Sequence, residues 1–323
     1  MSLSSISKPI HNDLETFNSI FKTSMKSNVG LVDLVAKYII KQKGKKIRPL
    51  LVLLSAKACG VVSERTHRGA TLVELLHTAT LVHDDVVDNA DQRRGFPSIN
   101  AVWKNKIAVL MGDYLLSRGL MIAVEGKDFD FLENITQTVK RMSEGELLQI
   151  KKTRKLDIDE GTYFRIIADK TASLLETCCI IGALSSTQNS EYVSAMQKYG
   201  VALGIAFQIK DDILDYEGSS KVFGKPIGGD IREKKITLPL IHALRSVTKS
   251  EASAIRALLK KINSKNSVNE IIEFVRKNNG IAYAEEVMNR YANDAKDALA
   301  VIPDAEAKTS LIQLVDFVVS RTS

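Results

Sequence analysis

Two short acidic motifs of the same form have the residue types and spacing to bind a cation. The segments "HDDVVD" (residues 83–88) and "KDDILD" (residues 210–215) both read Asp-Asp-apolar-apolar-Asp, and each follows an apolar stretch. In each motif the first and last carboxylates are four residues apart. On a helix they face the same way, about 6 Å apart along the axis. Like charges at that spacing repel each other, which favours a cation between them.

The ligand type indicates which cation. Carboxylate oxygens without His or Cys favour Mg²⁺, or Mn²⁺ in its place, over Zn²⁺. Mg²⁺ takes one or two protein carboxylates and completes its shell with water and substrate phosphates. A single acidic cluster is more often a solvated turn. Two clusters of identical form at two helix ends predict metal sites.

Basic residues lie at breaks between the apolar segments. Arg binds phosphate through two parallel hydrogen bonds, and Lys acts as a point charge. Each residue alone would be interpreted as a solubilising surface charge, but as a set around a metal site they predict diphosphate substrates. The set is Lys45 and Arg48 in "GKKIRP", Arg93 and Arg94 after the first cluster, Lys170 in "ADKTASL", Lys225 in "FGKPIGGD" and Lys235 in "REKKITLP".

Composition limits the class of protein. The chain has 323 residues, of which 45% are hydrophobic and 26% charged, and its 6 prolines and 18 glycines favour long helices over a many-turned β fold. The net charge is +7, but Lys and Arg are spread along the whole chain, so no nucleic-acid-binding groove is expected. The first residues lack the apolar core of a signal peptide, and no apolar run approaches the roughly 20 residues of a membrane span. We therefore expect a cytoplasmic protein without a membrane span.

Apolar residues recur at three- and four-residue spacings along most of the chain, which predicts helices. The expected helices cover residues 13–21, 31–40, 47–58, 68–88, 101–124, 131–150, 163–184, 192–214 and 238–244, followed by three or four more after residue 251. No convincing alternating strand is found. The prediction is a single all-α domain over residues 1–323, with roughly a dozen helices. The helix before the first acidic cluster is apolar on most faces, which places that cluster at the mouth of the core.

Both acidic motifs, together with "GKKIRP" and "DKTASL", resemble the trans-isoprenyl diphosphate synthases, also called polyprenyl synthetases. The resemblance runs in order from about residue 45 to residue 239. It implies an all-α bundle around a deep central cavity, usually as a homodimer. The implied reaction is head-to-tail condensation of isopentenyl diphosphate onto an allylic diphosphate, with three Mg²⁺ ions per active site. Whether this chain forms a homo- or a hetero-oligomer stays open.

The resemblance also implies a role for each matching residue. Asp84, Asp88 and Asp211 would bind the metal, supported by Asp85 and, more distantly, by Asp212 and Asp215. Lys45, Arg48, His77 and Arg94 would hold isopentenyl diphosphate. Arg93, Lys170, Lys225 and Lys235 would hold the allylic diphosphate, and Thr171 and Gln208 would face the developing allylic cation. The family's "REGK" reads "REKK" here, which leaves open whether Lys234 or Lys235 makes the phosphate contact.

Product length depends on the residues below the first cluster. Ala79 and Thr80 lie five and four residues before Asp84, about one helical turn deeper. In the family, an aromatic residue here goes with short products, so small residues imply a hexaprenyl to decaprenyl product, with heptaprenyl or octaprenyl favoured. That length suits a quinone side chain. The alternative is a short-chain farnesyl or geranylgeranyl synthase, in which Ala79 is small only to let two helices pack.

Two other kinds of protein were weighed. A class I terpene cyclase would also be all-α with an acidic motif, but it would not need "KDDILD" or "GKKIRP". A non-catalytic partner subunit that binds prenyl chains should have lost carboxylates, and none is missing here.

Overall fold

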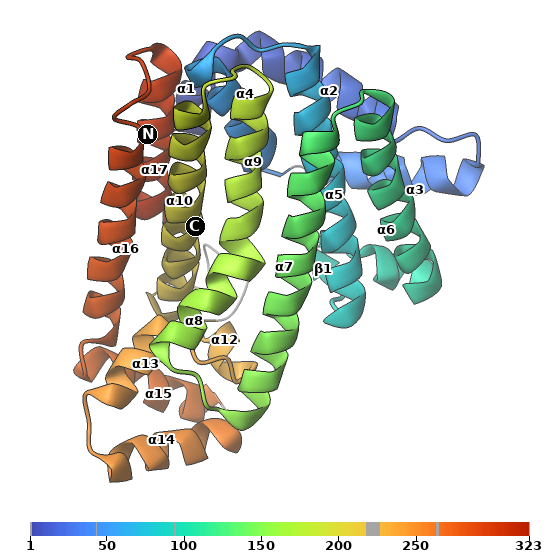
Figure 1. Cartoon of the computed structure of the whole chain (residues 1–323). Helices are drawn as coiled ribbons and strands as arrows, with labels where there is room; N and C mark the ends of the chain where they lie inside the picture. The colour runs from blue at the N-terminus through green and yellow to red at the C-terminus, as the bar shows by residue number, and fades with distance from the viewer. Residues whose placement is uncertain (1, 43, 94, 218–226, 263–264, 323) are drawn as a thin grey trace. The chain divides into compact units, whose positions relative to one another are not determined.

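The structure is a computed structural model that describes residues 2–42, 44–93, 95–217, 227–262 and 265–322 (Figure 1). The chain divides into two compact units. Unit 1 comprises Met1–Gln137, Thr177–Gln197 and Val301–Gln313, and unit 2 comprises Thr138–Glu176, Lys198–Ala300 and Leu314–Ser323. Four continuous helices contribute residues to both units: α7 (Phe129–Lys155), α9 (Ser173–Leu184), α10 (Ser190–Glu217) and α17 (Glu306–Ser320). One domain over residues 1–323 stays a prediction.

Unit 1 is built on helices, as the periodicity predicts. Its own elements are α1 (Leu3–Ile6), the 3₁₀ turn η1 (Lys8–Ile10), α2 (His11–Ser24), α3 (Gly30–Lys41), α4 (Ile47–Cys59), α5 (Glu64–Val87), β1 (Gln92–Arg93), β2 (Phe96–Pro97) and α6 (Ile99–Glu125). Helix α5 begins with a capping box in which the Ser63 side chain accepts from the backbone N–H of Thr66. Its apolar positions from Leu72 to Val82 are buried, except for the half-buried Leu81, so the helix carries its final acidic turn on a packed stem.

Helices α5 and α6 pack closely, because glycines on α6 leave room for side chains of α5. A Cβ built on Gly112 would lie 2.2 Å from Nε2 of His83, which is too close for any other residue there. The His83 ring also lies 3.2 Å from the carbonyl oxygen of Val109 and 3.4 Å from the Asp113 carboxylate. His83 therefore serves the packing of α5 against α6.

A small β-hairpin follows α5, where the sequence predicted only a break. Gln92 pairs with Pro97 and Arg93 with Phe96 in an antiparallel register. Gly95 has a φ of +78°, a conformation that residues with a side chain rarely adopt, so glycine permits this tight turn. Two-residue strands are too short to show an alternating pattern, so they could not be predicted from the sequence.

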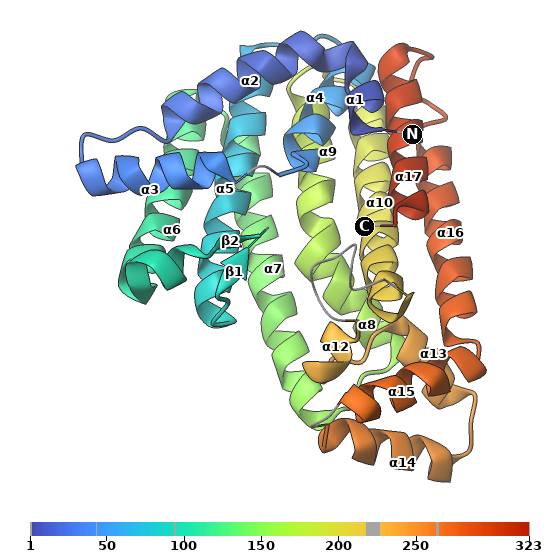
Figure 2. The same cartoon turned by 180° about the vertical axis from the view of Figure 1, so that it is seen from behind.

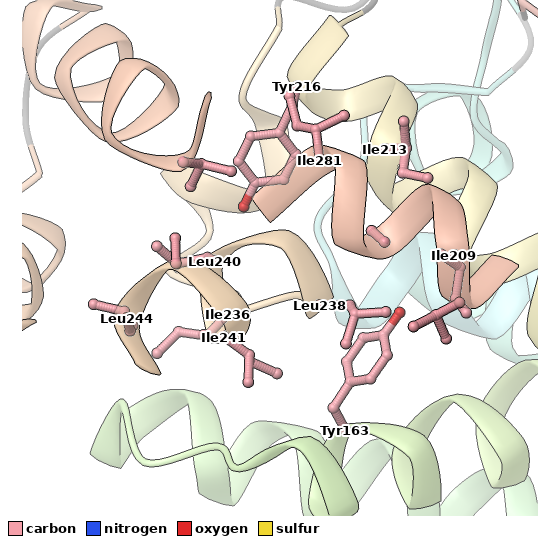
Figure 3. Close-up of a cluster of buried hydrophobic side chains, with 14 of the residues drawn as sticks. Tyr163, Ile209, Ile213, Tyr216, Ile236, Leu238, Leu240, Ile241, Leu244 and Ile281 are labelled. Atoms are coloured by element: carbon pink, nitrogen blue, oxygen red, sulfur yellow. The ribbon is translucent and has the colours of Figure 1, made fainter. Parts of the chain in front are cut away.

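Unit 2 surrounds its own apolar core. Its elements are α8 (Glu160–Ile167), the π-helical turn η2 (Ala168–Ala172), α12 (Gly229–Arg232), α13 (Leu238–Arg245), α14 (Lys249–Lys260), α15 (Lys265–Lys277) and α16 (Gly280–Ala298). Helices α13, α14 and α15 contact one another, as both views show (Figures 1 and 2). Tyr163 of α8, Ile209 of α10 and Leu238 of α13 point into a shared buried cluster, shown in Figure 3.

The helix expected over residues 163–184 is interrupted. Residues 168–172 form a π-helical turn between α8 and α9, and this turn carries Lys170 and Thr171. Arg141 of α7 holds the turn from outside, since its Nε donates to Asp169 at 3.0 Å and its Nη1 to Glu176 at 2.7 Å. Such turns are frequent at functional sites, because they re-aim side chains within an otherwise regular helix.

The expectation that no segment is long and apolar enough to span a membrane is wrong for α6. By length and composition alone, this helix of 27 residues is long and apolar enough to cross a membrane. Asp113 and Arg118 interrupt the apolar run, but they do not lower its average hydropathy enough to exclude it.

Candidate active site

The first acidic cluster ends α5 with carboxylates in two different environments. Asp84 and Asp88 are exposed, and the backbone N–H of Asp88 donates to the carbonyl of Asp84 at 2.8 Å, which keeps the last turn helical. Asp85 is 2% exposed, and Nε of Arg93 donates to its Oδ1 at 2.7 Å. The buried ion pair ties the hairpin to the helix. The exposed pair keeps the four-residue spacing that suits a cation.

A cavity of about 350 Å³ lies beside this cluster in unit 1 and is lined in part by His77, Asp85 and Arg93. Lys46 and Glu74 also line it, and the sequence analysis did not single out either of them. Burial lowers the pKa of Lys46, the Glu74 carboxylate opposes that shift, and Lys22 adds to it. The cavity therefore combines three basic side chains, those of Lys22, Lys46 and Arg93, with His77, a combination suited to an anion.

Two residues predicted to hold isopentenyl diphosphate lie next to this cavity in sequence but are not among its lining residues. Lys45 is exposed and Arg48 is half-buried, whereas Gly44 and Lys46 of the same "GKKIRP" segment line the cavity. Ala79 and Thr80 do not line it either. Ala79 is 1% exposed, and the Thr80 hydroxyl donates to the carbonyl of His77 at 2.9 Å.

The three carboxylates of the second acidic cluster lie in three different environments in unit 2. Asp215 accepts from the backbone N–H groups of Gly229 and Asp230 at 2.9 and 3.0 Å, so it fixes the start of α12. Asp212 is buried, and Asp211 is paired with Arg321 at 2.8 Å. Of the three side chains, that of Asp211 is partly exposed, at 43%, and its predicted metal role stays a prediction.

A smaller cavity of about 100 Å³ in unit 2 gathers five of the predicted site residues. They are Lys170, Thr171, Gln208, Asp212 and Lys235. Their polar groups form a chain: the Thr171 hydroxyl donates to Gln208 at 2.8 Å, and the Gln208 amide donates to Asp212 at 2.8 Å. These two hydrogen bonds fix the orientation of the Gln208 amide. The dipole of that amide therefore has its direction before any substrate binds.

The two lysine side chains that line this cavity pair with nearby carboxylates. Lys170 donates to Gln149 at 2.7 Å and contacts Glu146 at 2.5 Å. Lys235 contacts Glu233 at 2.5 Å, and its pKa is raised, because the burial that lowers it is outweighed by that partner. Lys234 instead donates to the carbonyl of Lys260 at 3.0 Å. Of the two lysines, Lys235 lines this cavity.

Two further residues of this cavity were missed by the sequence analysis. The Tyr163 hydroxyl donates to Asp212 at 2.6 Å, and Asp230 lies opposite in the segment "GKPIGGD". Burial raises the pKa of Asp212 well above its usual value, and Asp230 raises it further, although the bonds from Tyr163 and Gln208 oppose the shift. Burial also raises the pKa of Asp230 to about 6. The sequence feature that could have indicated Asp230 is the Gly-Gly-Asp at residues 228–230.

Two predicted residues, Arg94 and Lys225, lie outside the described residues.

Replacing Tyr163 by Phe should lower the free energy of unfolding by about 1–3 kcal/mol, because the buried Asp212 loses a donor. Chemical denaturation monitored by circular dichroism measures this change. Tyr283→Phe is the matched control, since its hydroxyl donates to Glu160 at 2.7 Å from a half-buried position. A Tyr163→Phe loss no larger than that of the control would contradict the role given to the Tyr163–Asp212 bond.

Comparison with known proteins decides the family. Residues 30–275 match the family described as Polyprenyl synthetase. The chain belongs to this family. It is 34% identical to the octaprenyl diphosphate synthase of Escherichia coli (strain K12), over 99% of both proteins. A polyprenyl synthase structure from Caulobacter crescentus CB15, complexed with calcium and isoprenyl diphosphate, is 32% identical with a TM-score of 0.92, covering 100% of this chain and 98% of that one.

A geranylgeranyl pyrophosphate synthase structure from Bacteroides thetaiotaomicron is 36% identical with a TM-score of 0.84, covering 98% of this chain and 99% of that one. Relatives with long and with short products are therefore similar to this polyprenyl synthetase to nearly the same degree. The family membership confirms the predicted all-α isoprenoid synthase fold and a prenyltransferase activity.

Proposed function

We propose that this polyprenyl synthetase is a long-chain trans-polyprenyl diphosphate synthase. It condenses isopentenyl diphosphate head-to-tail onto an allylic diphosphate, in an Mg²⁺-dependent reaction whose product supplies a quinone side chain. The observation on which the proposal depends is the exposure of the Asp84 and Asp88 carboxylates. Both are exposed at the end of a buried helix, with the i, i+4 spacing that suits a cation.

The carboxylates present fit Mg²⁺. Asp84, Asp88 and Asp211 offer hard oxygen ligands at exposed or half-exposed positions. Among the described residues no three His, Cys, Asp or Glu side chains converge on one point, so no closed protein cage of the kind that Zn²⁺ prefers is formed there. Mg²⁺ needs only one or two protein carboxylates and shares its shell with substrate phosphates. We propose three ions per active site, with Mn²⁺ as a substitute.

The chain's own cations would hold the two diphosphates. In unit 2, Lys170 and Lys235 line the same cavity, which supports their proposed role toward the allylic diphosphate. Arg93 and Lys225 are proposed for the same substrate on the family resemblance alone, since Arg93 lines the cavity of unit 1 and Lys225 lies outside the described residues. In unit 1, His77 faces a cavity with Lys46, which supports a role for that cavity toward isopentenyl diphosphate. Lys46 thus joins Lys45, Arg48 and Arg94 in the proposed set.

Each polar group has a defined part in the reaction. The chemistry that bound Mg²⁺ supplies is neutralisation of charge on the departing diphosphate. Lys170 and Lys235 add fixed positive charge to that leaving group. The oxygens of Thr171 and Gln208 direct their dipoles toward the allylic cation, and the buried apolar residues around them, including Ile167 and Ile166, exclude water that would trap it.

The assembly proposed is a homodimer. Beyond the kink at Lys104, helix α6 exposes a set of apolar side chains whose spacing places them on one side of the helix: Val109, Leu110, Met121 and Val124. An exposed apolar face of this kind is typical of a protein–protein interface, and a second copy of the chain would cover it. The proposed location is the cytoplasm, supported by a composition with 26% charged residues.

Substitutions of basic residues should separate the two substrates. Lys45→Ala and Arg48→Ala should raise the KM for isopentenyl diphosphate, whereas Lys225→Ala should raise the KM for the allylic partner. Each change removes a charge-assisted contact of about 1.5–3 kcal/mol, which corresponds to roughly 10- to 100-fold in KM. Steady-state kinetics with each substrate varied in turn measure the effect. Equal changes in both KM values would contradict this division of roles.

Release of inorganic diphosphate tests the reaction type. With Mg²⁺ and an allylic diphosphate, release should require isopentenyl diphosphate, because the family reaction joins the two substrates. Release without isopentenyl diphosphate would instead indicate a cyclase or a hydrolase. No release under either condition would favour a non-catalytic partner subunit.

A further inference from the structure

Arg321 contacts the second acidic cluster from a distant part of the sequence. It follows α17 directly, and its backbone N–H donates to the carbonyl of Phe317 at 3.1 Å, which continues the helix by one residue. Its Nη2 donates to Oδ1 of Asp211 at 2.8 Å and to the carbonyl of Phe207 at 3.0 Å. The same guanidinium nitrogen thus joins the Asp211 side chain to the backbone one helical turn earlier.

The Arg321 side chain is held in one orientation. It is 9% exposed, and its guanidinium carbon lies 4.1 Å from the centroid of the Phe207 ring. Its Nε is buried and donates to no atom of the described residues. The preceding helix is anchored by Leu314, Val315 and Val318, which are at most 1% exposed. A buried guanidinium with an unused donor is costly for folding, so its placement against Asp211 suggests a functional reason.

Asp211 is the member of its cluster for which this contact matters most. Asp212 is buried against Tyr163 and Gln208, and Asp215 caps α12. The Asp211 side chain is 43% exposed, so without a partner it would sample several rotamers in water. A carboxylate that must bind a cation does so more tightly when a neighbouring donor fixes its orientation.

We propose that Arg321 is a positioning residue for Asp211. It fixes the carboxylate in the orientation that binds a divalent cation, and it stays in place when the cation binds. The inference rests on the metal role proposed for Asp211. The opposite effect is also conceivable on physical grounds, because the charge of Arg321 repels a nearby divalent cation. The two effects predict changes of opposite sign when Arg321 is replaced, so binding measurements separate them.

Mn²⁺ binding in the presence of inorganic pyrophosphate tests the inference without any turnover. Electron paramagnetic resonance of free Mn²⁺ gives the dissociation constant for the full-length chain. We expect Arg321→Gln to weaken binding at one site by about 10- to 100-fold, the usual effect of losing a residue that orients a ligand. Arg321→Lys keeps the charge but not the planar contact, so it should restore only part of the affinity. The control is Arg245→Gln, whose partner is Glu160 at 2.6 Å; neither residue belongs to an acidic motif.

A second variant covers the case in which Arg321→Gln fails to fold. Phe207→Leu removes the ring under the guanidinium but leaves both hydrogen bonds, and it should weaken Mn²⁺ binding by about two- to fivefold. Unchanged or tighter binding in these variants, with normal binding by the parent chain, would overturn the positioning role alone. Failure of the parent chain to bind Mn²⁺ with pyrophosphate would overturn the proposed metal site and this inference together.

Discussion

Replacing Asp84 or Asp88 by alanine should lower kcat by roughly a hundredfold or more, because charge neutralisation at the leaving group contributes several kcal/mol. The fold should be retained. Both side chains are exposed, and removing one member of a repulsive i, i+4 pair does not weaken an isolated helix. Single-turnover rates at saturating Mg²⁺, together with thermal unfolding curves, measure the two effects separately.

Asp91→Ala is the matched control for this prediction. Asp91 is exposed on the turn just after α5, and its backbone carbonyl accepts from the N–H of Ser98 at 3.0 Å. The control should keep the parent rate. A variant of Asp84 or Asp88 that also kept most of its rate would show that the metal ligands lie elsewhere.

Ala79→Phe should shorten the product to farnesyl or geranylgeranyl diphosphate while turnover continues. Ala79 is buried about one turn below the Asp84 level, so an aromatic ring there would form a floor for the growing chain about one or two isoprene units from the diphosphate. Inserting a large side chain at a buried position should also lower stability by about 1–3 kcal/mol. Chromatography of the dephosphorylated products shows the length distribution directly.

Ala58→Phe separates the effect on product length from overpacking alone. Ala58 is also buried in unit 1 but belongs to α4, and its substitution should lower stability without changing product length. An active Ala79→Phe variant with unchanged products would show that the floor lies elsewhere. The neighbouring stretch on α6 from Met111 to Leu115, both buried, is then the next position to test.

Most of the fold could be predicted from sequence because helices repeat their apolar residues over several turns. In the segments that form α5 and α10, the apolar pattern repeats over many helical turns. The hairpin at residues 92–97 and the π-helical turn at residues 168–172 could not be predicted. Each is too short to show a period, and each depends on distant packing, such as the contact of Arg141 with Asp169.

The site could be predicted in part for a related reason. Spacing alone shows that the first and last carboxylates of each motif share a helix face. It cannot show which carboxylates make contacts within the protein. Asp215 is occupied by backbone N–H groups fourteen and fifteen residues away, and Asp211 by an arginine 110 residues later in the chain. Long-range partners of this kind leave no local pattern.

One measurement tests the central claim most directly: separation by length of the products that the purified protein makes from radiolabelled isopentenyl diphosphate. Geranyl, farnesyl and geranylgeranyl diphosphate should each be supplied in turn as the allylic primer, with Mg²⁺ and with excess chelator. The proposed function predicts a main product of hexaprenyl to decaprenyl length, most of it heptaprenyl or octaprenyl, that disappears with the chelator. A main product of farnesyl or geranylgeranyl length, or products formed equally well without a divalent cation, would contradict it.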